Sequence, residues 1–158
     1  MEQGVVYLKR KRLVELEQQL RELKTVERKD IADKIAEARS HGDLSENAEY
    51  DAAKEAQSHL EMKISKMENL LSRVKIIEDE DIPENTAYVL TEVKVLDMKR
   101  KEEYSYHLVS PDEADFEQDK ISIVSPLGKA LLGKKVGEIA SFTAPAGTIE
   151  YKILEIKK

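Results

Sequence analysis

Asp43 and Glu46 are the two residues of this sequence whose types and spacing best fit metal chemistry. Mg²⁺ prefers six oxygen ligands, and proteins commonly bind it with one or two carboxylates while water and phosphate oxygens occupy the other positions. Two carboxylates three positions apart therefore make an incomplete metal site. A partner molecule must supply the remaining ligands if this pair binds Mg²⁺.

The same segment also fits a purely structural interpretation, in which it begins a helix. Asp43 would be the N-cap, and Glu46 would be the N3 residue whose side chain reaches back in a capping box. Gly42, directly before it, would permit the positive φ that a tight turn between helices often requires. In both interpretations the carboxylates project close together from one face, so their spacing alone does not distinguish a helix cap from a metal site.

Two stripes of apolar residues at helical spacing flank these carboxylates. The first occupies positions 13, 16, 20, 23, 31, 35 and 38, with one interruption around Val26, and the second occupies positions 53, 56, 60, 64, 67, 71 and 74. Because the connection between the stripes is short, the helices should be antiparallel neighbours, which predicts a coiled-coil hairpin with its tip near residues 40–47. At about 1.5 Å per residue, a first helix from Leu13 to Arg39 would span roughly 40 Å.

The composition excludes several classes of protein. The chain has 158 residues, of which 41% are apolar, 5% aromatic and 37% charged, which suits a protein with much exposed helix and a small core. Its net charge of −6 gives no overall attraction to nucleic acid, so any contact with RNA must be local. The absence of cysteine excludes disulfides and thiolate metal sites. No apolar run approaches the ~18 residues of a membrane span, and residues 1–12 lack the apolar core of a signal peptide, so we expect a cytoplasmic protein.

An acidic segment that contains Pro83 separates the helical half of the chain from a β-rich half. Acidic residues and a proline are typical of the end of a helix and the start of a linker. We therefore predict a hairpin over residues 1–78, a linker over residues 79–85 and a second domain over residues 86–158. The predicted fold class is α+β.

The second domain shows the partial alternation and the turn residues of short strands. The predicted strands form two hairpins and one short edge strand: Ala87–Leu96 with Glu102–Val109, Glu138–Thr143 with Thr148–Ile156, and Ile121–Val124. Ser125 and Pro126 are typical of an N-cap and a first helical residue, and Gly133 is typical of the residue that follows a helix. We therefore expect one short helix, Pro126 to Leu132, within this β-rich domain.

An independent catalytic centre is not expected from the motifs. The sequence has no Gly-rich phosphate loop, no nucleophile elbow and no zinc ligand set. The three histidines, at positions 41, 59 and 107, are scattered.

Two parts of the sequence resemble a known family. Residues 35–50, IAEARSHGDLSENAEY, closely resemble the tip signature of the Gre transcript cleavage factors, GreA type. Residues 110–115 (SPDEAD) and 125–133 (SPLGKALLG) resemble the C-terminal domain of the same family, which has an FKBP-like fold. The resemblance covers nearly the whole chain, and it departs from the family pattern in residues 1–12.

The resemblance implies a function for the hairpin and a role for its acidic pair. Members of the family insert the hairpin through the secondary channel of RNA polymerase, while the C-terminal domain binds at the channel rim. They stimulate the polymerase's own cleavage of the 3′ end of nascent RNA in backtracked complexes. On this basis Asp43 and Glu46 would assist the polymerase active centre by helping to hold its second Mg²⁺ and a water, and the free factor would be a monomer.

The resemblance also implies roles for other residues. Arg39 and Lys54 match family positions attributed to a basic patch that faces the extruded RNA, although solvated surface charges are the structural alternative. The residues that would meet the polymerase rim are Asp112, Glu113 and Asp115. The structural alternative is that these acidic residues only keep a surface loop soluble.

Four further residues near the tip would orient it in the polymerase active centre, namely Gly42, Ser45, Asn47 and Tyr50. A structural alternative exists for two of them, because Ser45 would fit the first helical turn and Tyr50 would fit packing against His41 or Leu44. The charges of Glu49 and Asp51 are expected on a solvated helix face.

Three other functions are compatible with the same elements. A regulator of the same fold could occupy the channel without promoting cleavage, although the presence of Asp43 and Glu46 argues against it. An FKBP-like domain joined to a hairpin could also be a peptidyl-prolyl isomerase or chaperone, a hypothesis supported by fold analogy alone. Finally, the hairpin could be a structural adaptor whose acidic tip is only a cap.

Overall fold

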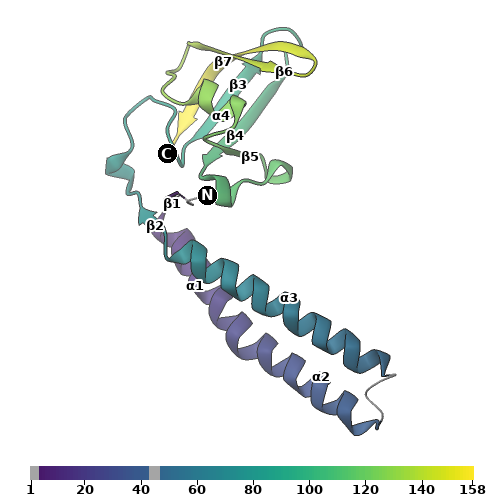
Figure 1. The fold of residues 1–158 in the computed structure, drawn as a ribbon. Coiled ribbons are helices and arrows are strands. Elements are labelled where there is room, and N and C mark those ends of the chain that lie inside the picture. The colour runs from purple at the N-terminus through teal and green to yellow at the C-terminus, as the bar shows by residue number, and fades with distance from the viewer. Residues whose placement is uncertain (1–3, 43–46) are drawn as a thin grey trace. The chain divides into compact units, whose positions relative to one another are not determined.

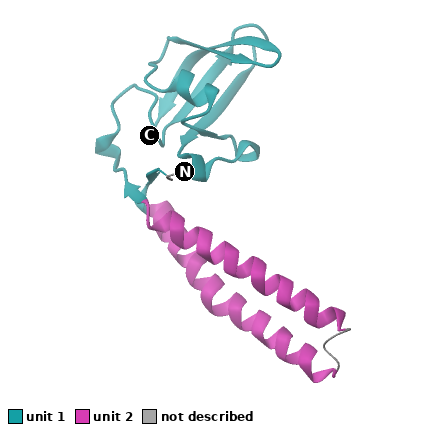
Figure 2. Ribbon diagram, viewed as in Figure 1, with its two compact units in different colours: residues 1–10, 74–158 teal, residues 11–73 magenta. Residues whose placement is uncertain are grey.

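The computed structural model describes residues 4–42 and 47–158, which divide into two compact units (Figure 2). One unit comprises residues 11–73, and the other combines residues 1–10 with residues 74–158. This division differs from the boundaries at residues 78 and 85 that the composition suggests. The difference arises because the segments at the base of the hairpin pair with each other as strands and belong with the β-rich unit.

The first unit is the predicted antiparallel helical hairpin (Figure 1). Its first arm is continuous helix, made of α1 (Arg10–Glu22), the π-helical turn η1 (Leu23–Glu27) and α2 (Arg28–Ser40). The second arm is α3 (Ala48–Leu71). The α-helical hairpin and the β-rich second unit confirm the predicted α+β fold class.

The π-helical turn explains the interruption in the first apolar stripe. Leu23 and Ile31 are eight positions apart, whereas two α-helical turns contain about seven residues. A π turn accommodates one extra residue, so Val26 faces solvent while the apolar positions before and after it keep facing α3. Leu23 is 4% exposed and packs with Leu60 and Ile64, and Ile31 contacts the same cluster.

Two residues of the second apolar stripe do not lie on the seam. Ala56 is exposed, and the half-buried residue at this level of α3 is Gln57. Val74 was predicted to continue the helix, but α3 ends at Leu71 and Val74 begins strand β2 (Val74–Ile76). The β-branched pair of Val74 and Ile76 favours a strand, and it finds a partner strand in β1 (Val6–Leu8).

Strands β1 and β2 form a parallel pair that joins the two ends of the hairpin. Val6 and Leu8 are almost fully buried. The backbone N–H of Tyr7 donates a hydrogen bond of 2.9 Å to the hydroxyl of Ser110, which is fully buried in the β-rich unit. The N-terminal segment is therefore an integral part of that unit.

The β-rich unit is built on a five-stranded sheet in the order β5-β4-β3-β7-β6. Its strands are β3 (Glu92–Asp97), β4 (Glu103–Val109), β5 (Lys120–Ser122), β6 (Ile139–Ala144) and β7 (Gly147–Lys157). All pairs are antiparallel except β4 with β5. Helix α4 (Pro126–Leu131) covers one face, where Leu131 is fully buried against Val93, Val95 and Ile153.

Three short 3₁₀ helices complete this unit: η2 (Asp79–Asp81), η3 (Pro111–Glu113) and η4 (Phe116–Gln118). The described residues contain no helix long and apolar enough to cross a membrane.

Most of the predicted β elements are confirmed, including both hairpins and the edge position of the strand near Ile121. The cap of α4 is also confirmed, since the Ser125 side chain accepts from the backbone N–H of Gly128, and Gly133 has a φ of +83°. The prediction was wrong for residues 87–91. Leu90 has a φ of +70°, and Thr91 closes a turn onto the Tyr88 carbonyl, which is incompatible with an extended strand.

Candidate functional site

The described part of the hairpin tip begins where α2 ends. The backbone N–H of His41 donates to the carbonyl of Ala38 (3.2 Å), and that of Gly42 donates to the carbonyl of Arg39 (3.3 Å). Gly42 has a φ of +102°, so it occupies the left-handed conformation that the sequence predicts for this position. These bonds satisfy carbonyl groups that the end of the helix leaves without helical partners.

On the other side of the tip, α3 begins with Asn47 as its N-cap rather than Asp43. The Asn47 side chain accepts a hydrogen bond of 3.1 Å from the backbone N–H of Tyr50. The prediction that Asp43 is the N-cap of this helix is therefore wrong, because α3 starts only at Ala48. Asp43, Ser45 and Glu46 themselves lie outside the described residues, so their roles stay predictions.

Asn47 also contacts the other helix. Its side-chain N–H donates to the carbonyl of Ala38 at 2.7 Å, nine positions earlier in the chain. This bond was not predicted, because a contact between the end of one helix and the cap of the next leaves no periodic signal. An asparagine at the N-cap is its only trace in the sequence.

A second contact across the tip joins His41 and Glu49, whose Nδ1 and Oε2 atoms are 3.0 Å apart. Both side chains are largely exposed, at 49% and 70%, so the pair adds little to stability. Glu49 was expected on a solvated face, and the structure adds this partner across the turn. Tyr50 is half-buried.

The two predicted cationic residues lie on opposite arms close to the tip. Arg39 is exposed in the last turn of α2 and has no ion pair with any residue in the described ranges. Lys54 is exposed on α3, and its Nζ donates to the Gln57 side chain at 3.0 Å. Both cations are available to an external anion, while their role toward RNA stays a prediction.

Within residues 4–42 and 47–158 no group of three or more His, Cys, Asp or Glu side chains could hold a metal ion. Asp43 and Glu46, the two carboxylates predicted to bind Mg²⁺, lie outside these ranges, so that role stays a prediction.

The three predicted rim residues lie on consecutive short turns of the β-rich unit. Asp112 and Glu113 belong to η3, and Asp115 caps η4 by accepting from the backbone N–H of Glu117 at 3.1 Å. Asp115 therefore has a structural role in addition to any binding role. Phe116, directly after it, is 77% exposed, which is unusual for a large aromatic residue.

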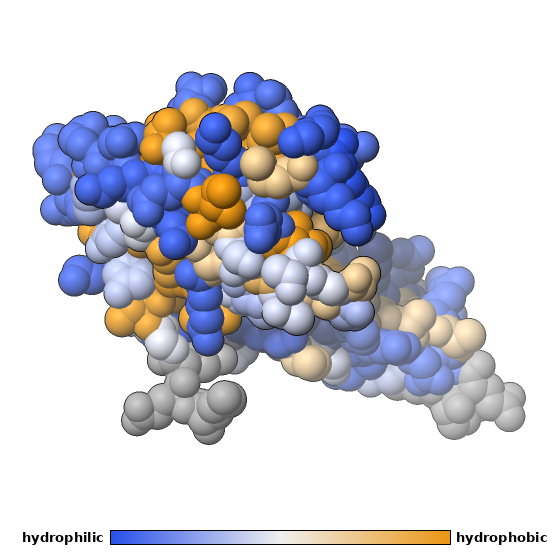
Figure 3. All heavy atoms as spheres, turned by 90° about the horizontal axis from the view of Figure 1, so that it is seen from above, coloured by the Kyte–Doolittle hydropathy of each residue, from blue (hydrophilic) through white to orange (hydrophobic). Residues whose placement is uncertain are grey.

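Phe116 borders an apolar cavity of about 590 Å³, which also contacts Leu127, Pro126, Phe142 and Pro145. Figure 3 shows apolar patches among hydrophilic residues on this unit. Sequence reasoning did not predict the cavity, because α4, η4 and the β6–β7 turn contribute its walls from separate segments.

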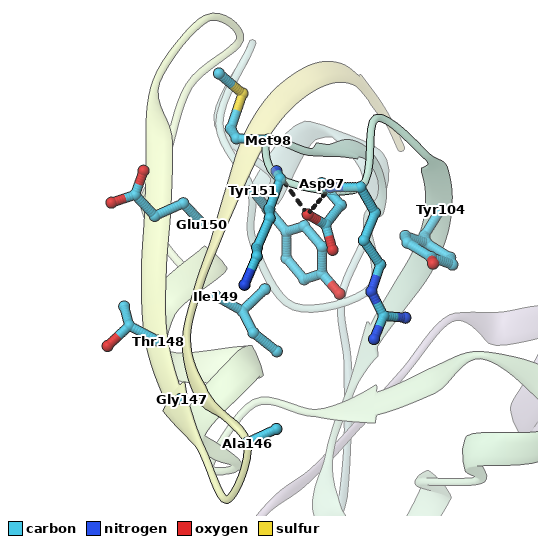
Figure 4. Close-up of a pocket in the computed structure, with 11 residues that line it drawn as sticks. Asp97, Met98, Tyr104, Ala146, Gly147, Thr148, Ile149, Glu150 and Tyr151 are labelled. Carbon is cyan, nitrogen blue, oxygen red and sulfur yellow. Dashed lines mark hydrogen bonds between the residues drawn. The ribbon is translucent and has the colours of Figure 1, made fainter.

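A second cavity, of about 690 Å³, lies between the β3–β4 and β6–β7 turns (Figure 4). Tyr104, Tyr151 and Asp97 face it. Both backbone N–H groups of the turn, from Arg100 and Lys99, donate to Oδ1 of Asp97, and these bonds hold the pKa of its carboxyl below the ordinary value. Asp97 thus closes the turn between β3 and β4.

Comparisons with known proteins agree with both units. Residues 6–76 match the family model "Transcription elongation factor, N-terminal", and residues 82–158 match the model "Transcription elongation factor, GreA/GreB, C-term". The chain belongs to the GreA/GreB family of transcription elongation factors.

Individual members of the family match nearly the full chain. Transcription elongation factor GreA of Flavobacterium psychrophilum is 49% identical over 98% of each chain, and that of Acetivibrio thermocellus is 49% identical over 92% of each chain. Among solved structures, the GreA factor homolog 1 (Gfh1) protein of Thermus thermophilus covers 99% of this chain with 30% identity and a TM-score of 0.45, and it is covered over 100% of its own length. The family models and the GreA relatives confirm the family resemblance predicted from residues 35–50.

Proposed function

We propose that this protein inserts its helical hairpin into the secondary channel of RNA polymerase and stimulates the polymerase's own cleavage of 3′ RNA in backtracked complexes. The carrying observation is the acidic pair of Asp43 and Glu46 in the GreA-like sequence between α2 and α3. The family assignment supports the class of function, and the chemistry of the pair supports the cleavage.

The dimensions of the hairpin support its insertion into a pore. Helix α3 contains 24 residues and is therefore about 36 Å long. Two packed helices form a narrow rod, and the outward faces of both arms are mostly polar, with a few exposed apolar side chains such as Val14 and Met62. Such a rod can carry a short acidic segment into a centre that a globular domain cannot enter.

The residues of the tip have complementary roles in this proposal. The carboxylates of Asp43 and Glu46 help to hold Mg²⁺ and to position a water near the scissile phosphodiester. When bound, Mg²⁺ stabilises the charge on the attacking and leaving oxygens of a phosphodiester. Arg39 and Lys54 attract the phosphates of the RNA, which the acidic pair would otherwise repel.

The β-rich unit would hold the factor at the rim of the channel. Asp112 and Glu113 lie on a turn close in sequence to the exposed Phe116 and its apolar cavity. A partner that offers basic residues around an apolar side chain would fit this combination of acidic turn and apolar cavity. The protein would then act as an activator of the polymerase, without an active site of its own.

A transcript cleavage assay tests the proposal. Stalled, backtracked polymerase complexes with end-labelled RNA are mixed with the protein and Mg²⁺, and shortening of the RNA is followed over time. Asp43→Asn and Glu46→Gln, which keep side-chain shape but remove charge, should each slow the stimulated cleavage by a factor on the order of 10².

Asp33→Asn is the matched control, because Asp33 is an exposed carboxylate on α2, the helix that precedes the acidic pair in the sequence. It should leave the rate unchanged. If the unaltered protein failed to shorten the RNA while binding the polymerase, the proposed cleavage function would be wrong and a non-cleaving regulator would replace it.

A further inference from the structure

The side-chain amide of Asn47 makes hydrogen bonds to both arms of the hairpin. Its Oδ1 accepts from the backbone N–H of Tyr50 on α3 (3.1 Å), and its Nδ2 donates to the carbonyl of Ala38 on α2 (2.7 Å). We call these two bonds the amide bridge. One side chain thereby links the end of one helix to the start of the next.

Capping α3 alone would not require asparagine. Serine, threonine and aspartate are comparable N-caps, but a serine hydroxyl is too short to reach both groups and a carboxylate has no donor for a carbonyl. A primary amide supplies an acceptor and a donor at the same time. The bridge also defines the orientation of the amide, because reversing it would place N–H against N–H and oxygen against oxygen.

Burial makes the amide bridge stronger than the other contact across the tip. Ala38 is 1% exposed and Asn47 is half-buried, so water competes weakly for the Ala38 carbonyl. The His41–Glu49 pair is largely exposed and therefore contributes less. Of these two polar contacts across the tip, the amide bridge is therefore the stronger link between the arms.

We propose that Asn47 is a positioning residue that sets the spacing of the two arms at the tip, and that this spacing controls the rate of the stimulated cleavage. This inference rests on the proposed function. Reaction rates depend steeply on placement, and a misplacement of about 1 Å can cost a factor of 10². Loss of the bridge should therefore lower the cleavage rate of the bound factor without weakening its binding to polymerase.

Asn47→Ser tests the inference in the cleavage assay, because it keeps a good N-cap but removes the donor to Ala38. At saturating factor, cleavage should slow by a factor of roughly 10, while the factor concentration for half-maximal stimulation stays unchanged. Asn47→Asp should also slow cleavage, since a carboxylate likewise lacks the donor to the Ala38 carbonyl. Asn69→Ser, the same substitution at the other end of α3, is the matched control and should change neither quantity.

A second measurement follows the geometry without polymerase. The chain has no cysteine, so Glu37→Cys and Glu55→Cys, both at exposed positions near the tip, can carry one spin label each. The distance distribution between the labels should be narrow in the otherwise unaltered protein and broader in the Asn47→Ser background. The far-UV circular dichroism of the two proteins should be the same, which excludes unfolding as the cause.

The outcomes separate the inference from the proposed function. If the unaltered factor cleaves RNA and Asn47→Ser cleaves it equally fast, the positioning role is wrong and the cleavage function stands. If Asn47→Ser cleaves more slowly but the distance distribution is unchanged, the positioning role is also wrong, because the amide would then act directly in the active centre. Absence of any cleavage overturns the function, while the distance measurement still tests the bridge.

Discussion

The hairpin and the β-rich unit bury their side chains in different ways. The hairpin has a single line of contact between two helices, in which Leu23, Leu60 and Ile64 form the central cluster. The β-rich unit has a continuous core between the sheet and α4, where Leu131 and Ile153 are fully buried. A thin seam specifies which faces meet, but each residue in it has few buried neighbours.

Because of this difference, the functional segments of the two units are held in place by different interactions. A seam with polar surroundings permits a long rod whose end also depends on local hydrogen bonds such as those of Asn47. A continuous core holds loops from several strands in place, and the acidic turn at Asp112 and the exposed Phe116 depend on it. Substitutions can test whether the two units respond independently.

Gly128→Ala should have the largest effect. A Cβ at this position would lie 2.0 Å from the carbonyl oxygen of Ser122, where α4 passes the backbone of β5. Alanine favours a helix by about 1 kcal/mol relative to glycine, but the clash should outweigh this and lower the free energy of unfolding by about 3 kcal/mol. Urea unfolding followed by near-UV circular dichroism of the tyrosine cluster measures the change.

Lys129→Ala, at the exposed neighbouring position, should leave that unfolding curve in place. The helical signal of the hairpin should persist when the Gly128→Ala core has unfolded. Loss of both signals at the same urea concentration would show that the two units unfold as one.

Ile64→Ala should have the next largest effect, and it should be local to the hairpin. Ile64 is 2% exposed, but it lies in a thin seam that can partly close over the lost atoms. We expect a loss of about 2 kcal/mol, the lower end of the range for such truncations. Far-UV circular dichroism should report it, with Met62→Ala, 60% exposed on the same helix, as a nearly silent control.

Deletion of Val26 should cost less than about 1 kcal/mol, although deletions in helices are usually severe. It would convert the π turn into ordinary α-helix and bring Leu23 and Ile31 to the seven-residue spacing of two turns. Deletion of Gln18, in regular helix, would instead rotate one part of the arm by about 100° and break the seam. Thermal unfolding compares the two deletions, and equal losses would contradict this account of the π turn.

The smallest effect should come from the charge of Asp97 at low pH. Hydrogen bonds from the Arg100 and Lys99 backbone lower its pKa in the folded state below the ordinary value of 3.8. Its contribution to stability is therefore complete above the unfolded-state pKa and is lost as the pH falls through the folded-state pKa. The melting temperature should therefore fall more between neutral and acidic pH in wild type than in Asp97→Asn, because the asparagine side chain does not titrate.

Glu117→Gln, at an exposed carboxylate, serves as the control and should keep the pH dependence of the unaltered protein. If Asp97→Asn showed that same dependence, another carboxylate would account for the acid sensitivity of the unit.

Local patterns predicted the elements whose signals lie within a short stretch of sequence. The two apolar stripes predicted the hairpin, and alternation with turn residues predicted the two β-hairpins. Ser125 and Gly133 marked both ends of α4 because caps depend on neighbouring residues only. The start of α3 was placed too early, since Asp43 and Asn47 are both good caps and only packing selects between them.

The candidate site was predictable in type but not in geometry. The residues from Gly42 to Tyr50 could be singled out through their chemistry and family resemblance. Their contacts could not, because the partners of Asn47 and Glu49 lie on the opposite arm, at Ala38 and His41. Contacts between such positions follow no regular spacing in the sequence, so no periodic pattern predicts them.

The sequence by itself determined that this protein has a helical hairpin with an acidic turn and a β-rich second half, since periodicity and turn chemistry are local properties of the chain. Only the tertiary structure decided that Val6–Leu8 pairs with Val74–Ile76, that a π turn keeps the seam in register, and that Asn47 links the two arms. Each of these depends on groups that folding brings together from distant positions, where a backbone hydrogen bond or a buried contact selects one partner among many.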